Sequence, residues 1–185
     1  MKEYALLLIL AAITDNMLLV HALGTDWLTL IRREDRSLPT AFWLLLGINT
    51  LTSLAAYFLR DIVSGKSMAV AVYTVICAAL IGVAALIFSR SNKSGQARVL
   101  LQLVAVDAAV PALMFITAGC ASVTKAVVTA VGATAGLAIA FTAVICISER
   151  LKSSQPPSSF KGAPLLVASM AIIAVALTGF EGLGA

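Results

Sequence analysis

Four side chains with a carboxylate, amide or imidazole group lie in one largely apolar stretch near the start of the sequence, ITDNMLLVHALGTDW: Asp15, Asn16, His21 and Asp26. A fifth, Asp107, lies in the apolar stretch VAVDAAVPAL. A carboxylate or amide in such surroundings can coordinate a cation, relay a proton, or accept hydrogen bonds from backbone amides where a helix is interrupted. The chemistry to consider is therefore ion or proton handling on the one hand and helix capping on the other.

The composition indicates that these residues lie in a membrane protein. Of the 185 residues, 61% are hydrophobic and 12% are charged, whereas a soluble domain is about half apolar and about a quarter charged. The net charge is +4, but the basic residues fall in short loops and form no basic, aromatic-rich surface for nucleic acid. The sequence predicts an all-α integral membrane protein.

Six apolar runs approach the roughly 20 residues that a helix needs to cross a bilayer. They are Tyr4–Gly24, Pro39–Leu59, Met68–Phe88, Val99–Ala118, Val123–Ile147 and Ala163–Phe180. Asp15 and Asp107 lie near the middle of the first and fourth runs, where an acid facing lipid costs about 2.5 to 3.5 kcal/mol. We therefore expect both acids to face a protein interior or a wet cavity.

The loops predict the orientation of the six transmembrane helices. An even number of spans places both termini on one side of the membrane. The first, third and fifth loops carry nine of the 13 Lys and Arg residues, and the opposite side carries four. Because basic loops are retained in the cytoplasm, both termini are expected outside.

The two halves of the chain correspond after a shift of 92 residues. This shift lays the second span on the fifth, the third on the sixth, and Asp15 on Asp107. Each half holds three spans, so two such repeats would insert with opposite orientations and place a functional site near the midplane. We predict a single membrane domain, 1–185, of two inverted-topology three-helix repeats at about 1–92 and 93–185. The first and fourth helices are the candidates for an interruption at the midplane.

Two interpretations of the buried acids remain open. In one, Asp15 and Asp107, with Asn16, bind a cation or relay protons. In the other, each acid caps a half-helix where its span is interrupted. Thr14-Asp15-Asn16 is a run of good N-cap residues, and Pro111 after Asp107 suits an interrupted helix. The two roles are compatible, because a broken helix at the midplane can itself form an ion site.

The sequence contains no recognisable catalytic or metal-binding set. His21 is the only histidine, and we expect it to be a buried, hydrogen-bonded side chain. The three cysteines are far apart, form no CxxC pair, and are expected to be structural. Gly132 and Gly136 lie four residues apart, a pattern typical of close helix packing in membranes. We expect a non-catalytic membrane protein.

Motifs at both ends of the chain carry a family resemblance. They are Met1-Lys2-Glu3-Tyr4 before a leucine run, Asn16, Leu19-Val20, Leu23-Gly24, Glu149-Arg150-Leu151, Pro157, Phe160, Lys161-Gly162-Ala163-Pro164, Gly179-Phe180 and Gly182-Leu183. With them the chain resembles the small six-helix subunits of the Rnf and Nqr complexes, RnfA-type members above all. The resemblance spans the whole chain and is thinnest from about Phe42 to Leu100.

The resemblance implies a place in an electron transport complex that couples redox chemistry to Na⁺ or H⁺ translocation. It also implies a bacterial or archaeal cytoplasmic (inner) membrane and an opposite-topology sibling subunit. Siblings in that family each contribute two cysteines to an iron-sulfur cluster at their shared interface. Here Asp26 and Ala108 stand at the two cysteine positions. The family thus implies a cluster whose ligands this chain lacks, so we expect this chain alone to bind no cofactor.

Three functions follow. The leading one is a subunit of an Rnf/Nqr-like translocase complex that has no iron-sulfur cluster of its own. The alternative is a cluster-free paralogue acting as a small ion or proton transporter or channel subunit, with Asp15 and Asp107 as its acids. The third is an assembly scaffold without chemistry of its own.

Overall fold

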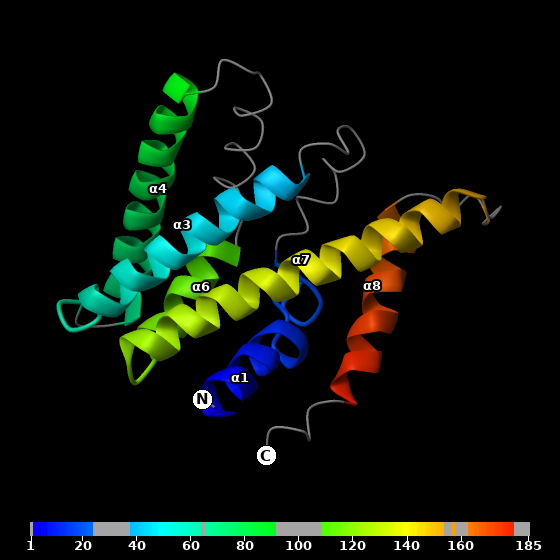
Figure 1. The fold of residues 1–185 in the computed structure, drawn as a ribbon, viewed down its shortest axis with the longest axis horizontal. Helices are drawn as coiled ribbons and strands as arrows, with labels where there is room; N and C mark the ends of the chain where they lie inside the picture. The colour runs from blue at the N-terminus through cyan, green and yellow to red at the C-terminus, as the bar shows by residue number, and fades with distance from the viewer. Residues whose placement is uncertain are drawn as a thin grey trace.

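The described part of the chain is built from helices. A computed structural model describes residues 2–23, 38–63, 66–91, 109–153, 157 and 163–179. These residues form six helices and no strand: α1 (Lys2–Ile9) with its π-helical continuation η1 (Leu10–Thr14), α3 (Leu38–Leu59), α4 (Lys66–Ser91), α6 (Ala109–Ala118), α7 (Val123–Ser153) and α8 (Ala163–Thr178) (Figure 1). The all-α prediction is confirmed for them. The inverted repeat remains a prediction.

The largest differences from the predicted helix ends are in the first and the fifth helix. The first helix stops at Thr14 and does not continue to Gly24, because a run of polar residues begins there. The fifth helix continues past Ile147 to Ser153. The residues that follow Ile147 include Glu149, Arg150 and Leu151, which are good helix formers. The loop predicted after the fifth span is therefore shorter than expected.

Helix α7 is the central element. It contacts α1, η1, α3, α6 and α8, with α3 antiparallel to it on one side and α1 on the other (Figure 1). Large side chains fully buried in the core lie on α3, α6 and α7: Leu45, Val110, Leu113, Met114, Leu137, Phe141 and Val144. In a bilayer, close packing of this kind is a main source of helix association, since lipid tails are as apolar as leucine.

Helix α4 and the turn before it are attached at one end of the bundle. The Tyr73 ring on α4 lies edge-on to Phe115 on α6, with ring centroids 5.2 Å apart. After α3, the Arg60 guanidinium donates to the Cys120 carbonyl at 2.6 Å and lies 4.2 Å from the centroid of the Tyr57 ring. The turn that follows α3 is thereby tied to the turn between α6 and α7.

Hydroxyl groups inside the helices are mostly satisfied by their own backbone. In each case the hydroxyl donates to the carbonyl four residues earlier, at 2.7 to 2.9 Å. The residues are Thr50, Thr52, Thr74, Thr117, Thr134, Thr142 and Ser169. This local bond lets a hydroxyl lie in an apolar environment without a partner from another helix.

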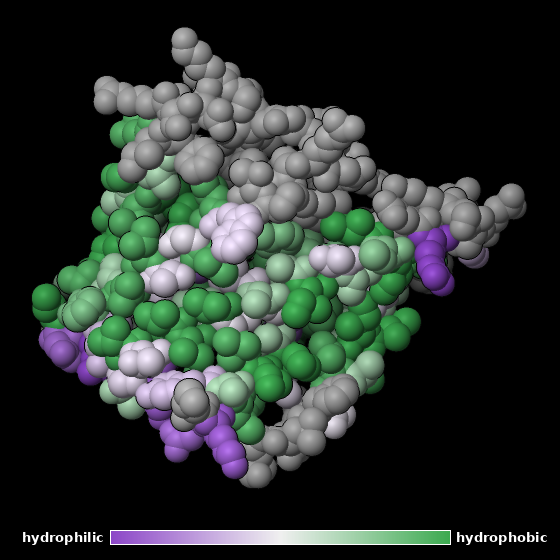
Figure 2. Space-filling view, in the orientation of Figure 1, coloured by the Kyte–Doolittle hydropathy of each residue, from purple (hydrophilic) through white to green (hydrophobic). Residues whose placement is uncertain are grey.

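The outer surface of the described helices is strongly apolar. Large side chains point away from the core, among them Trp43, Phe58 and Ile172, which are 75%, 66% and 72% exposed. In Figure 2 hydrophobic residues cover the middle of the visible face, and hydrophilic ones gather at its margins. Two helical stretches, Phe42–Leu59 and Val123–Ile147, are long and apolar enough to cross a membrane, and three shorter apolar helices accompany them.

Candidate functional site

The first helix breaks at Asp15. Its last turn widens to a π-helix, in which the Asp15 N–H donates to the Leu10 carbonyl at 2.9 Å. The Thr14 hydroxyl donates to the same carbonyl at 2.8 Å. Asp15 then leaves the helical conformation (φ −107°, ψ 46°), and residues 15–23 form a run of turns. The first helix therefore ends inside its predicted span, at the polar run. The residues after Leu23, where a second half-helix would lie, and the matching part of the fourth span are outside the described part of the chain.

Asn16 fixes the broken end of this helix to α7. Its side chain is buried, with 2% exposure, and its Nδ2 donates to the Ala12 carbonyl at 2.9 Å and to the Gly136 carbonyl of α7 at 2.8 Å. Its Oδ1 accepts from the N–H groups of Leu18 and Leu19 at 3.0 and 3.3 Å. A primary amide has two donors and two acceptor positions. The hydrogen-bonding capacity of Asn16 is thus fully used within the chain.

Two glycines on α7 make this attachment sterically possible. A Cβ added to Gly132 would lie 3.0 Å from the Leu8 carbonyl oxygen and 3.1 Å from the Ala11 Cβ. At Gly136 it would lie 2.6 Å from the Ala12 Cα and 2.8 Å from the Ala12 carbonyl carbon. These neighbours are mainly backbone, which cannot turn aside as a side chain can. The close-packing role predicted for the two glycines is confirmed.

A second buried amide reaches α7 from the opposite side. Asn49, near the middle of α3, is 2% exposed, and its Nδ2 donates to the Thr134 hydroxyl oxygen at 2.9 Å. Thr134 and Gly136 are two residues apart and therefore point to nearly opposite faces of a helix. The middle of α7 thus lies between two buried asparagines, Asn16 from the first helix and Asn49 from α3.

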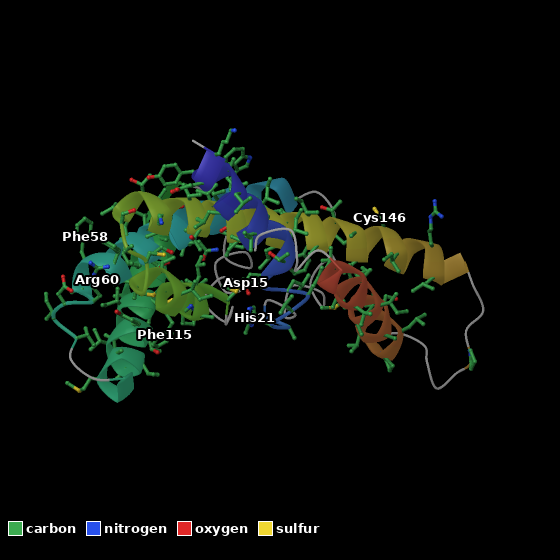
Figure 3. The ribbon with its side chains drawn as sticks, turned by 90° about the horizontal axis from the view of Figure 1, so that it is seen from below. Asp15, His21, Phe58, Arg60, Phe115 and Cys146 are labelled. Atoms are coloured by element: carbon green, nitrogen blue, oxygen red, sulfur yellow. The ribbon has the colours of Figure 1, made fainter. Side chains whose placement is uncertain are left out.

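Asp15 takes part in a different interaction from Asn16. The Asp15 Oδ1 lies 2.7 Å from the His21 Nε2, and the two side chains are 54% and 41% exposed. Figure 3 shows both residues in the turns that follow η1. At this distance the imidazole and the carboxylate share one hydrogen bond. The helix break thus carries an exposed pair of polar groups of opposite chemical character, an acid and a base.

Two sequence-based expectations change at this pair. His21 is hydrogen-bonded as expected, but it is exposed and not buried, because the chain turns outward after the helix break. Ala22, the next residue, has a positive φ of 53°, the left-handed conformation that supports such a turn. The residue that accepts the free backbone amides is Asn16, whereas the Asp15 carboxylate bonds to His21.

The remaining predicted site residues lie outside the described part of the chain. They are Asp107, Ala108 and Asp26. Among the residues that the structure describes, no three His, Cys, Asp or Glu side chains are close enough together to hold a metal ion. Cys77 is buried, Cys120 is half-buried and Cys146 is exposed, and none of the three is in a disulfide bond.

Asn49 and its partner Thr134 were not predicted from the sequence. A signal for Asn49 was present, since an amide in the middle of a long apolar span is uncommon and usually faces other helices. Its partner could not be named from sequence, because the two residues are 85 positions apart.

A substitution at the glycine contact tests this arrangement. In Gly136→Ala the new methyl group meets the Ala12 backbone, and we expect the free energy of unfolding to fall by about 1 to 3 kcal/mol or more. Gly82→Ala on α4 is the matched control, because nothing lies within 4 Å of its added Cβ and alanine favours a helix by about 1 kcal/mol. Melting of the purified variants in detergent checks both. If Gly136→Ala melted at or above the temperature of the wild-type protein, as Gly82→Ala is expected to do, the close contact would be contradicted.

Comparison with known proteins identifies the family of this chain. The family described as "Rnf-Nqr subunit, membrane protein" matches residues 4–184. A relative from Pasteurella multocida (strain Pm70), whose name places it in an ion-translocating oxidoreductase complex, is 24% identical over 193 aligned positions, covering 99% of each chain. The family match extends over nearly the whole sequence, including both the broken first helix and the central α7. The chain therefore belongs to the Rnf-Nqr family of membrane subunits.

Proposed function

We propose that this chain is a membrane subunit of an electron transport complex that couples redox chemistry to Na⁺ or H⁺ translocation, and that it holds no iron-sulfur cluster of its own. The family membership supports the first part, together with the relative named as part of an ion-translocating oxidoreductase complex. The replacement of both family cysteines by Asp26 and Ala108 supports the second. The redox centres would then belong to partner subunits.

The observation that carries the ion-handling role is the pair formed by Asp15 and His21. The carboxylate lies where the first helix breaks, and the only other acid of that helix is Glu3 in its first turn. The Asp15 side chain faces away from the core. An ionisable pair at such a place in an apolar chain is costly unless a polar partner or water surrounds it. We propose that Asp15, together with Asp107 from the second half, takes up the translocated cation or proton. Asn16 holds the helix break in place beside them.

The outward direction of the pair also suggests where a partner lies. A sibling subunit of opposite topology would cover the turns after η1 and enclose Asp15 and His21 at a shared interface. The proposed setting is a bacterial or archaeal inner membrane, with both termini outside. The loop charges support this orientation, because nine of the 13 basic residues are on the opposite side.

The ion-handling proposal is tested by Asp15→Asn in the complete complex, reconstituted in liposomes. The amide can still bond to His21, so we expect an unchanged melting temperature, electron transfer within about twofold of wild type, and a loss of ion movement of tenfold or more. Asp61→Asn is the matched control, since Asp61 lies in the turn after α3 with its side chain 84% exposed.

If the Asp15→Asn complex moved ions at the wild-type rate, the proposed role of this carboxylate would be contradicted. If the isolated chain moved Na⁺ or H⁺ and Asp15→Asn stopped it, the alternative function would be favoured, that of a small ion or proton transporter or channel subunit. The Asp15–His21 pair is the feature that this alternative would use.

The absence of a cluster is tested on the chain co-purified with its sibling. We expect no electron paramagnetic resonance signal from a cluster between the two proteins, because one side offers no thiolate at positions 26 and 108. The double variant Asp26→Cys, Ala108→Cys supplies both thiolates and is expected to gain iron and sulfide. A cluster signal from the wild-type pair that needs both proteins together would overturn this part of the proposal.

A further inference from the structure

Two buried polar atoms on α3 have no hydrogen-bond partner among the described residues. They are the Oδ1 of Asn49 and the Oγ of Ser53, in residues that are 2% and 0% exposed. Residues four apart on a helix lie on the same face. Burying a polar atom without a hydrogen-bond partner costs free energy. This face of α3 therefore carries two such atoms, one helical turn apart.

The orientation of the Asn49 amide follows from its neighbours. The Thr134 hydroxyl donates its only proton to the Ala130 carbonyl at 2.8 Å. It can therefore only accept from Asn49, which places the Asn49 NH₂ group toward α7. The Asn49 Oδ1 then remains as a free acceptor inside the core.

The Ser53 hydroxyl differs from the other helical hydroxyls. Seven of them donate to the carbonyl four residues earlier, which for Ser53 would be the carbonyl of Asn49. The Ser53 hydroxyl does not make this bond; the Asn49 carbonyl is approached at 3.1 Å by the Thr52 hydroxyl, which shares its one proton with the closer Ile48 carbonyl. The Ser53 hydroxyl is left with a proton to donate, on the same face as the free Asn49 acceptor.

We infer that Asn49 and Ser53 hold one buried water molecule inside the helix bundle. Ser53 donates to the water oxygen, and the water donates to the Asn49 Oδ1, so one molecule satisfies both atoms. A metal cation fits less well, because the buried polar side chains of the described core are all neutral: Asn16, Asn49, Thr52, Ser53, Thr117 and Thr134. Within the described part of the chain, no buried carboxylate would compensate the charge of a cation there. This water site is independent of the function proposed above.

The sign of one stability change tests this inference. If the water is bound, Ser53→Ala removes a hydrogen-bonded group, and the melting temperature of the lipid-embedded protein should fall by on the order of 2 to 4 °C. If the hydroxyl is unpaired, its removal should raise the melting temperature. Ser169→Ala on α8 is the matched control, because its hydroxyl bonds only to the Leu165 carbonyl, and a change smaller than for Ser53→Ala is expected.

A second measurement reads the water directly. Water-edited solid-state nuclear magnetic resonance of the labelled protein in lipid should show early transfer from water to Ser53 and Asn49, and this transfer should be lost in Ser53→Ala. A raised melting temperature in Ser53→Ala, or no transfer in wild type, would overturn the inference. Melting in sodium chloride and in choline chloride tests for a cation. If sodium chloride raised the melting temperature of the wild type above that in choline chloride, and Ser53→Ala lost this difference, a bound cation would replace the water and the inference would be overturned.

Discussion

The backbone of Ala12 lies directly against Gly136 of α7, and the rest of the described structure depends on this contact. It brings the Gly136 carbonyl within reach of the Asn16 amide, which donates to it and to the Ala12 carbonyl. The same amide accepts the N–H groups that the helix break leaves free. Without the glycine, the first helix could not approach closely enough for Asn16 to make these bonds, and a broken helix in an apolar medium would carry unpaired backbone groups.

The polar side chains divide by charge around α7. Buried ones are neutral amides and hydroxyls, and each of the two asparagines bonds to the central helix from its own side. The carboxylate of Asp15 instead faces outward and pairs with His21. The core is therefore held by neutral hydrogen bonds that require no counter-charge. The one acid at the helix break stays accessible to a partner protein or an ion, which supports a role at an interface within a membrane complex.

Much of this arrangement could be predicted from local sequence. The length of the apolar runs predicts six helices, the polar triplet Thr14-Asp15-Asn16 predicts the break, and the spacing of Gly132 and Gly136 predicts close packing. Which residue of the triplet takes the capping role could not be predicted, because Asn16 is selected by a carbonyl 120 positions away. The outward position of His21 depends on the turn after the break, which the hydropathy of the sequence does not encode.

Disulfide trapping would establish the register of the first helix on α7. In a background with the three native cysteines replaced by alanine, Ala11→Cys with Gly132→Cys should crosslink on mild oxidation. A Gly132 β-carbon would lie 3.1 Å from that of Ala11, and a separation by a few tenths of an ångström reaches the roughly 3.5 to 4.5 Å of a disulfide. Ala11→Cys with Thr134→Cys should not, because Thr134 faces α3 on the other side of α7. Efficient crosslinking of the first pair alone is the predicted result. Equal crosslinking of both pairs, or of the second alone, would contradict the clamped, broken first helix described above.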